Sequence, residues 1–210
     1  MHSLARKYRA FYLAVEAFCA EWVANQGHGF DHDTLVAGFA VRIAATPHIA
    51  ELAWIASHLH SFDRRLPKEE VEKVVRRHIA LVPDLSSDDV EWIWEAVRDH
   101  SEKNNENDNA VSIALKDADR LANIGPSVII RGGQFYPNTT TQDFGHLLDF
   151  DPASKYNEPK TVLDDLRFCL EWELWLRLPE AQRIAKPFFD FLRAFFEMNA
   201  KHVQEAELDG

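Results

Sequence analysis

The chain has 210 residues, of which 46% are hydrophobic, so it is long enough to bury a sizeable core and short enough for one domain. Its 34 acidic residues outnumber its 23 lysines and arginines, which gives a net charge of −11. This balance disfavours binding to a nucleic-acid polymer, because contacts to the phosphate backbone need clustered Lys and Arg. It still allows a small phosphorylated molecule as a partner in a local pocket.

The chain's two cysteines, Cys19 and Cys169, both lie in apolar helical stretches. We expect reduced thiols buried in the core, which fits a cytoplasmic location. The sequence shows no secretory signal and no apolar run of membrane length. We therefore expect no membrane partner.

Helical periodicity dominates the N-terminal part of the chain. Apolar side chains recur at three- and four-residue spacings from Leu4 to Trp22, which predicts one long amphipathic helix. The run Gly27-His28-Gly29 is expected to end it. No segment of the chain shows the convincing alternation of a strand, so the predicted fold class is all-α.

Prolines and capping residues divide the middle of the chain into further helices. Pro47 separates two of them, and Pro67 suits the first turn of a third. Ser86 or Ser87 can cap the helix that ends near His100. A polar, Asn-rich stretch follows, and a Gly-Pro pair stops the next helix. The predicted ranges are about 32–45, 48–62, 67–79, 87–100 and 110–123.

The last third of the chain combines an irregular stretch with two long helices. Residues 131–157 carry three glycines, two prolines and several threonines, which predicts an insertion or a lid. Helices are predicted at 159–177 and 180–203, with a hinge at Leu178-Pro179. The short run 128–130 fits a strand or a helix. Because no repeat or linker interrupts the chain, residues 1–210 are predicted to form a single-domain helical bundle.

Histidines and aspartates on these helices can build a metal site, because borderline divalent metals prefer imidazole and carboxylate ligands. His58 lies about 200° from His60 around the helix axis, so at most one of them can face a given site. Asp117 and Asp119, which are also two residues apart, are separated by the same angle of about 200° around their helix axis. A site must therefore take one residue from each pair and converge from several helices. The candidates are His32, one of His58 and His60, His100, and one of Asp117 and Asp119.

The order of these residues resembles the HD-domain phosphohydrolases. In that family a His, an adjacent His-Asp pair and a distant Asp lie on a bundle of helices. Here His32 is followed by His60 after Ala-Ser-His-Leu, by His100-Ser101, and by the motif Asp-Ala-Asp-Arg-Leu at 117–121. The likeness is to a small bacterial branch in which this motif continues into Gly and Arg. It covers about residues 5–198.

The resemblance implies a divalent metal ion, which could be Mn, Fe, Ni, Co, Zn or Mg, and the hydrolysis of a small phosphate ester such as a nucleotide. The metal ligands that it implies are His32, His60 and Asp119. His100 is expected to contact phosphate, and Arg131 to bind it through two hydrogen bonds. Asp117 is the fallback for Asp119 and could instead orient a ligand from beside the site.

Two positions depart from the family pattern. Ser61 stands where the family has the Asp of the pair, and Leu35 stands where an Arg usually follows the first His. A neutral hydroxyl is a much poorer ligand than a carboxylate. Asp63 and Asp31 are nearby carboxylates that could compensate, and Asp63 lies three residues after His60 on a compatible helix face.

Ser61 also supports a rival interpretation. The chain would then be a catalytically degenerate protein that keeps the HD-type fold and binds a ligand or a partner. Independently of the function, a homodimer is a candidate assembly, since the phenylalanine-rich stretch at 188–196 can serve as core or as a dimer surface.

Overall fold

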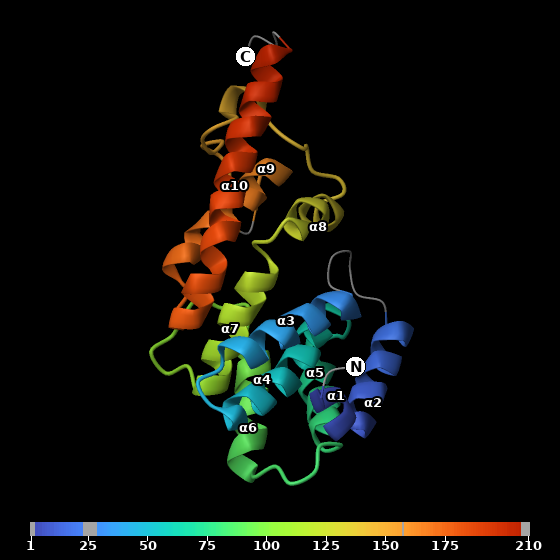
Figure 1. The fold of residues 1–210 in the computed structure, drawn as a ribbon. Coiled ribbons are helices and arrows are strands. Elements are labelled where there is room, and N and C mark those ends of the chain that lie inside the picture. Colours follow the sequence, from blue (N-terminus) through green and yellow to red (C-terminus); the bar gives the residue numbers. More distant parts are fainter. Residues whose placement is uncertain (1–2, 23–28, 157, 207–210) are drawn as a thin grey trace. The chain divides into compact units, whose positions relative to one another are not determined.

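The computed structural model of the chain describes residues 3–22, 29–156 and 158–206. Over these ranges the regular structure is helical, and two isolated β-bridges occur but no strand. The predicted all-α fold class is therefore confirmed. The chain divides into two compact units, residues 1–122 and residues 123–210 (Figure 1).

The N-terminal amphipathic segment forms two helices rather than the predicted one. Helices α1 (Ser3–Lys7) and α2 (Arg9–Glu21) meet at Tyr8, whose backbone angles of φ −108° and ψ 44° are not helical. Helical hydrogen bonds continue across the break, from Tyr8 N to Leu4 O and from Tyr12 N to Tyr8 O. The break leaves the apolar spacing intact, so periodicity could not reveal it.

The predicted stop for this segment, Gly27-His28-Gly29, lies mostly outside the described residues. Within them, α2 ends at Glu21 and Gly29 immediately precedes α3 (Phe30–Ile43). Asp31 and Asp33 lie in the first turn of α3, where carboxylates interact favourably with the helix dipole.

Helix α4 (Pro47–Leu59) begins with a side-chain cap and ends in a change of winding. Thr46 Oγ1 accepts a hydrogen bond from Ile49 N at 3.2 Å, and Pro47 takes the first helical position, where its missing N–H costs little. The helix predicted at 48–62 stops being α-helical at Leu59. Residues His60–Arg64 form the 3-10 turn η1, whose tighter winding changes the directions of the side chains at 60 and 61.

The first unit continues with α5 (Lys68–Ile79), α6 (Ser87–Asp99) and α7 (Ala110–Ala122). Ser86 caps α6, which decides between the two serines that the sequence offered. Its Oγ accepts a hydrogen bond from Asp89 N at 3.1 Å, and Asp89 Oδ2 accepts one from Ser86 N at 3.0 Å. Asp89 also lies 2.8 Å from His48 Nε2, which ties the start of α6 to the start of α4.

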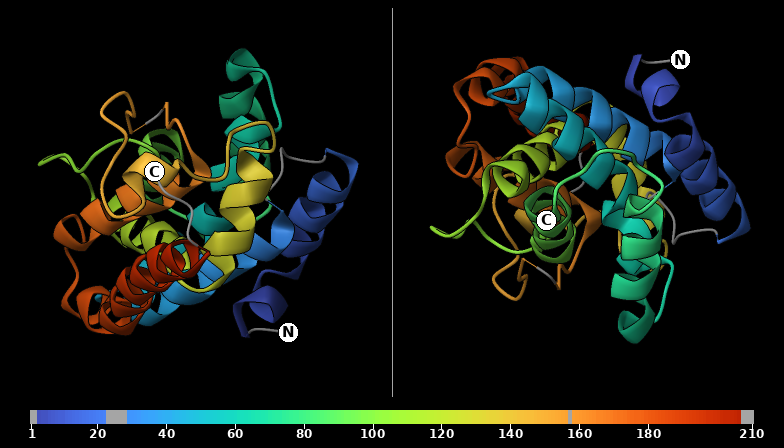
Figure 2. Two further views of the ribbon diagram at one scale, coloured as in Figure 1. Left: turned by 90° about the horizontal axis from the view of Figure 1, so that it is seen from above. Right: turned by 90° about the horizontal axis from the view of Figure 1, so that it is seen from below.

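Three helices form the centre of this unit. Helix α3 packs against both α4 and α7, and α4 packs against α6 and α7 (Figure 1). Alanines such as Ala40, Ala53 and Ala118 are fully buried, and their small side chains allow the backbones to approach closely. Helix α2 lies at the edge of the unit in both views of Figure 2, with the ring of Phe11 against Trp54 of α4.

The second unit contains α8 (Ser127–Phe135), α9 (Val162–Phe168) and α10 (Pro179–Glu205), with the 3-10 turns η2 (Phe144–His146) and η3 (Cys169–Leu174). The ambiguous run at 128–130 is helical. The segment predicted as irregular from residue 131 stays helical as far as Phe135. The long helix predicted at 159–177 is wrong, because α9 begins only after its cap Thr161 and gives way to η3 after Phe168.

A buried arginine fixes part of the irregular segment to α9. The Arg167 guanidinium donates hydrogen bonds to the carbonyl of Leu147 at 2.8 Å and to the carbonyl of Asp149. It also pairs with Asp164 at 3.1 Å, and Ser154 donates to the same carboxylate at 2.6 Å. The loop around residues 147–154 is therefore anchored, and its use as a lid stays a prediction.

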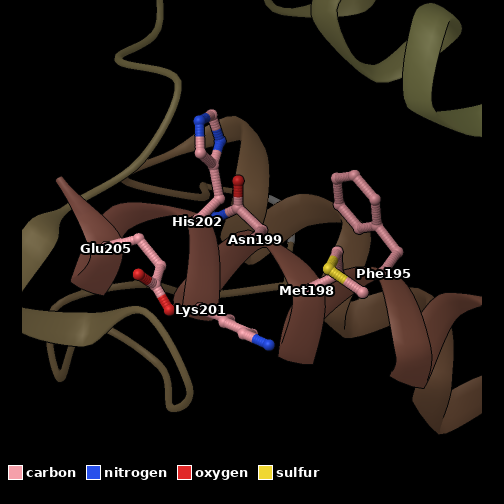
Figure 3. Close-up of a pocket in the computed structure, with 6 residues that line it drawn as sticks. All are labelled: Phe195, Met198, Asn199, Lys201, His202 and Glu205. Carbon is pink, nitrogen blue, oxygen red and sulfur yellow. The ribbon is translucent and has the colours of Figure 1, made fainter.

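Helix α10 buries one side and exposes the other. Phe189 and Phe196 are buried, whereas Phe191 is exposed, so the phenylalanine-rich stretch contributes to the core. A hollow follows the exposed side near the end of the helix (Figure 3), lined by Phe195, Met198, Asn199, Lys201, His202 and Glu205. In the part of the chain that the structure describes, no helix is long and apolar enough to cross a membrane.

Replacement of the capping serine, Ser86→Ala, removes the acceptor for Asp89 N. We expect the free energy of unfolding to fall by about 1 kcal/mol, the usual value of such a cap. Urea denaturation followed by circular dichroism measures it. Ser87→Ala is the matched control, since Ser87 is exposed and follows the cap, and it should change stability by less than half as much. Equal effects of the two changes would contradict the assignment.

Candidate metal centre

Three side chains from different elements of the first unit converge on one point. His32 lies in the first turn of α3, His60 at the junction of α4 and η1, and Asp119 on α7. One ligand atom from each residue can be chosen so that all three atoms lie within 4.8 Å of one another. This is the triad that the sequence predicted, and it is able to hold a metal ion.

The distances within the group suit a single ion. Asp119 Oδ1 lies 3.2 Å from His32 Nε2 and 3.8 Å from His60 Nε2. Ligand atoms that bind a tetrahedral ion at 2.0–2.2 Å lie about 3.3–3.6 Å apart. Both imidazoles are buried, whereas the Asp119 side chain is 23% exposed, so solvent reaches the group on the Asp119 side.

His60 is held in the form that binds metals. Its Nδ1 donates a hydrogen bond to the carbonyl of Ser57 at 2.6 Å, which leaves the lone pair on Nε2. Among the described residues, Nε2 has no hydrogen-bond partner, although it faces the Asp119 carboxylate. Burial lowers the pKa of His60 well below its ordinary value, so the ring stays neutral. Two electron-pair donors facing each other in this way favour a cation between them.

Asp119 stays ionised despite the apolar surroundings. Burial would raise the pKa of its carboxyl, but other interactions, of which the contact with the His32 ring is the largest, outweigh that effect and hold the pKa below its usual range. The group therefore offers one negative charge and two imidazole nitrogens.

His100 lies beside the triad without belonging to it. Its ring centroid is 5.1 Å from that of His60, and the ring is buried. Its Nδ1 donates to the carbonyl of Val97 at 2.8 Å, so Nε2 is the nitrogen left for a ligand. His100 therefore lies next to the triad, and its expected contact with phosphate stays a prediction.

His58 and Asp117, the alternatives to His60 and Asp119, are not part of the triad. His58 is buried against aromatic rings, with Trp54 and Tyr12 at centroid distances of 4.3 and 5.6 Å. Asp117 is fully buried and pairs with Arg120 at 3.4 Å. Asp117 is outside the triad, and its suggested role in orienting a ligand stays a prediction.

The carboxylates suggested as substitutes for the missing aspartate also lie apart from the triad. Asp63 is exposed and lies 3.7 Å from its neighbour Arg64. Asp31 is exposed as well, with its carboxylate close to Gly29. Leu35, at the position where an Arg was expected, is 43% exposed.

One site residue escaped the sequence analysis. Asp33 is completely buried, and its Oδ2 accepts a hydrogen bond from Ser61 Oγ at 2.8 Å. Its Oδ1 lies 3.6 Å from His60 Nδ1, and Arg65 Nη2 lies 3.4 Å from Oδ2. The helical spacing could have indicated that Asp33 is buried, because it precedes the buried Val36 by three residues and the buried Ala37 by four.

Arg131, the candidate phosphate-binding residue, belongs to the second unit. It lies on α8, and its guanidinium donates a hydrogen bond to Asn123 Oδ1. Its predicted role in binding phosphate stays a prediction.

Comparison with solved structures shows that this fold occurs in two bacterial proteins. A Northeast Structural Genomics target from Lactobacillus plantarum matches with a TM-score of 0.71 and 17% identity, over 93% of this chain and 98% of its own. Bacillus subtilis YpgQ, solved in complex with ADP, matches with a TM-score of 0.61 and 18% identity, over 94% and 97%. No protein-family model matches the chain, and no match is found among curated proteins. At these identities the likeness establishes the fold alone.

Asp33 gives the metal-free protein a specific pH dependence. Burial raises the pKa of its carboxyl to about 7, against the lowering effects of Ser61 and Arg65. The folded protein therefore holds a proton that the unfolded chain has lost above about pH 4, so the stability that Asp33 contributes is lost as the pH rises from 4 through 7. Relative to Asp33→Asn, the wild type should lose up to about 1.4 kcal/mol of unfolding free energy per pH unit in this window.

Urea denaturation of both proteins at several pH values, with chelator present, measures this difference. Glu91→Gln is the control, because Arg76, whose guanidinium stays charged, lowers the pKa of Glu91, and the contribution of Glu91 should not change between pH 5 and 7. A constant difference between wild type and Asp33→Asn would show that Asp33 is ionised throughout.

Proposed function

We propose that the protein is a metal-dependent phosphohydrolase that acts on a small phosphate ester, with a nucleotide as the favoured substrate class. The observation that carries the proposal is the convergence of His32, His60 and Asp119 within 4.8 Å. The HD-type order of these residues in the sequence supports the same activity.

The donor set fits a catalytic metal. Two imidazoles and one carboxylate are a common set in catalytic zinc sites, where three protein ligands leave a position open for water or substrate. The imidazoles favour Mn, Fe, Co, Ni or Zn over Mg, which prefers oxygen ligands. A divalent ion in this position lowers the pKa of a bound water and offsets the charge on phosphoryl oxygens.

The chain's own residues have separate roles in this proposal. His60 and His32 bind the ion from the buried side, and Asp119 binds it next to solvent, where a substrate can enter. His100 contacts the phosphate through Nε2, since its Nδ1 is used by Val97.

Two observations bear on the substrate, one on nucleotides and one on phosphate esters in general. YpgQ, which shares the fold, was solved in complex with ADP. A phosphate-bearing substrate also needs local positive charge in a protein whose net charge is −11, and a bound divalent ion provides it.

Loss of a ligand should abolish both metal binding and activity. We expect His60→Ala and Asp119→Asn to lose bound metal and to lower phosphohydrolase activity by more than about 100-fold, because even changes beside a metal ligand cost 10–100-fold. Metal content by mass spectrometry, and phosphate release from nucleoside mono-, di- and triphosphates with Mn²⁺, Co²⁺ or Ni²⁺, measure these effects.

His48→Ala is the matched control, because the His48 side chain is 59% exposed and lies at the far end of α4 from His60. It should retain metal and activity. A wild-type protein that takes up none of these ions, or a His60→Ala protein with full activity, would refute the proposal.

The rival function is ligand binding without catalysis, which the neutral Ser61 favours. In that case wild-type protein would bind the metal and a nucleotide in calorimetry but release no phosphate from any compound in the panel.

A further inference from the structure

The buried acid next to the triad has a defined geometry. Asp33 Oδ1 lies 3.6 Å from His60 Nδ1, while Asp119 Oδ1 lies 3.8 Å from His60 Nε2. Since Nδ1 and Nε2 lie on different sides of the imidazole, the two carboxylates flank the ring. Asp33 is not part of the ligand group, so it faces the side of His60 that is turned away from the metal position.

We propose that Asp33 is a positioning residue for the metal ligand His60. This inference rests on the proposed metal site. The Asp33 carboxylate stabilises the Nδ1–H tautomer, together with the Ser57 carbonyl that accepts the hydrogen bond at 2.6 Å. A carboxylate beside the N–H of a ligating histidine fixes the orientation of the ring and increases the basicity of the other nitrogen.

Ser61 and Arg65 hold this carboxylate in place. Ser61 Oγ donates to Asp33 Oδ2 at 2.8 Å, and Arg65 Nη2 lies 3.4 Å from both Asp33 Oδ2 and Ser61 Oγ. The Arg65 guanidinium also donates to the carbonyl of Trp22, the residue after α2. Ser61 is therefore an anchor for Asp33 and does not itself need to bind the metal.

This arrangement predicts how a carboxylate at position 61 behaves. Ser61→Asp alone brings a second acid against Asp33 in a buried site, where two like charges repel strongly. Exchange of the two residues, Asp33→Ser with Ser61→Asp, moves the carboxylate across one hydrogen bond and keeps a hydroxyl and Arg65 beside it. We expect the single change to weaken metal binding and the exchange to restore most of it.

The test is a Co²⁺ titration at pH 8, followed by visible absorption and by calorimetry, on folded proteins checked by circular dichroism. Asp33→Asn should bind Co²⁺ about 10–100-fold more weakly than the wild type. The exchanged protein should bind within several-fold of the wild type, whereas Ser61→Asp alone should not.

Asp89→Asn is the matched control. Asp89 is also largely buried, accepts from Ser86 and contacts His48, but it lies at the start of α6. Its loss should reduce stability and leave Co²⁺ affinity unchanged. If Asp33 had only a structural role, Asp33→Asn would likewise lower stability and leave Co²⁺ affinity unchanged. Equal Co²⁺ affinity of the wild type and folded Asp33→Asn would therefore overturn the inference. The proposed metal site would not be affected by that result.

Failure of the metal site has a different signature, because wild-type protein would then bind no Co²⁺. Failure of catalysis alone would appear as Co²⁺ binding without phosphate release. If Asp33→Asn does not fold, Ser61→Ala provides the test, since it removes the anchor and keeps the acid. It should weaken Co²⁺ binding several-fold and alter the cobalt absorption spectrum. Unchanged affinity and spectrum would count against the inference.

Discussion

The close packing of α3 against α4 and α7 is the constraint on which the site depends. Helices α3 and α7 carry His32 and Asp119, and His60 follows directly after α4. A shift of any of these helices would separate atoms that now lie 3.2 and 3.8 Å apart. Buried alanines on these helices make the close approach possible. The same packing removes water from His32 and His60 and leaves Asp119 partly exposed. Access to the proposed metal is therefore set by the fold.

The two acids around His60 illustrate how surroundings decide the behaviour of one residue type. The pKa of Asp119 is lowered because imidazoles surround it, in spite of burial. The pKa of Asp33 is raised because burial outweighs the effects of Ser61 and Arg65. Asp119 thus remains charged where a cation would bind. Asp33 lies on the other side of His60, the ligand that it is proposed to orient. Position 61, where the family pattern has a carboxylate, is occupied by the hydroxyl of Ser61, which donates to Asp33.

Buried ion pairs fix the chain around α7. Lys116 Nζ lies 2.9 Å from Asp108 Oδ1, and both side chains are almost completely buried. Arg120 donates to Asn104 at 2.8 Å and pairs with Asp117. The polar stretch after His100 is therefore held against α7, the helix that carries Asp119. Buried pairs of this kind are costly to break, since removal of one partner leaves an uncompensated charge.

The sequence by itself determined the helical class, most helix boundaries in the first 122 residues and the identity of the triad. The helices follow from local signals, namely apolar spacing, prolines and caps. The triad follows from the resemblance of the His and Asp order to the HD-domain phosphohydrolases. Helical angles also placed only one of His58 and His60 at the site. Only the tertiary structure decided the break at Tyr8, the 3-10 turns at His60 and Cys169, and the short α9, because apolar spacing is similar in these windings. It alone revealed Asp33, whose importance comes from contacts with Ser61 and Arg65, about 30 residues away in the chain.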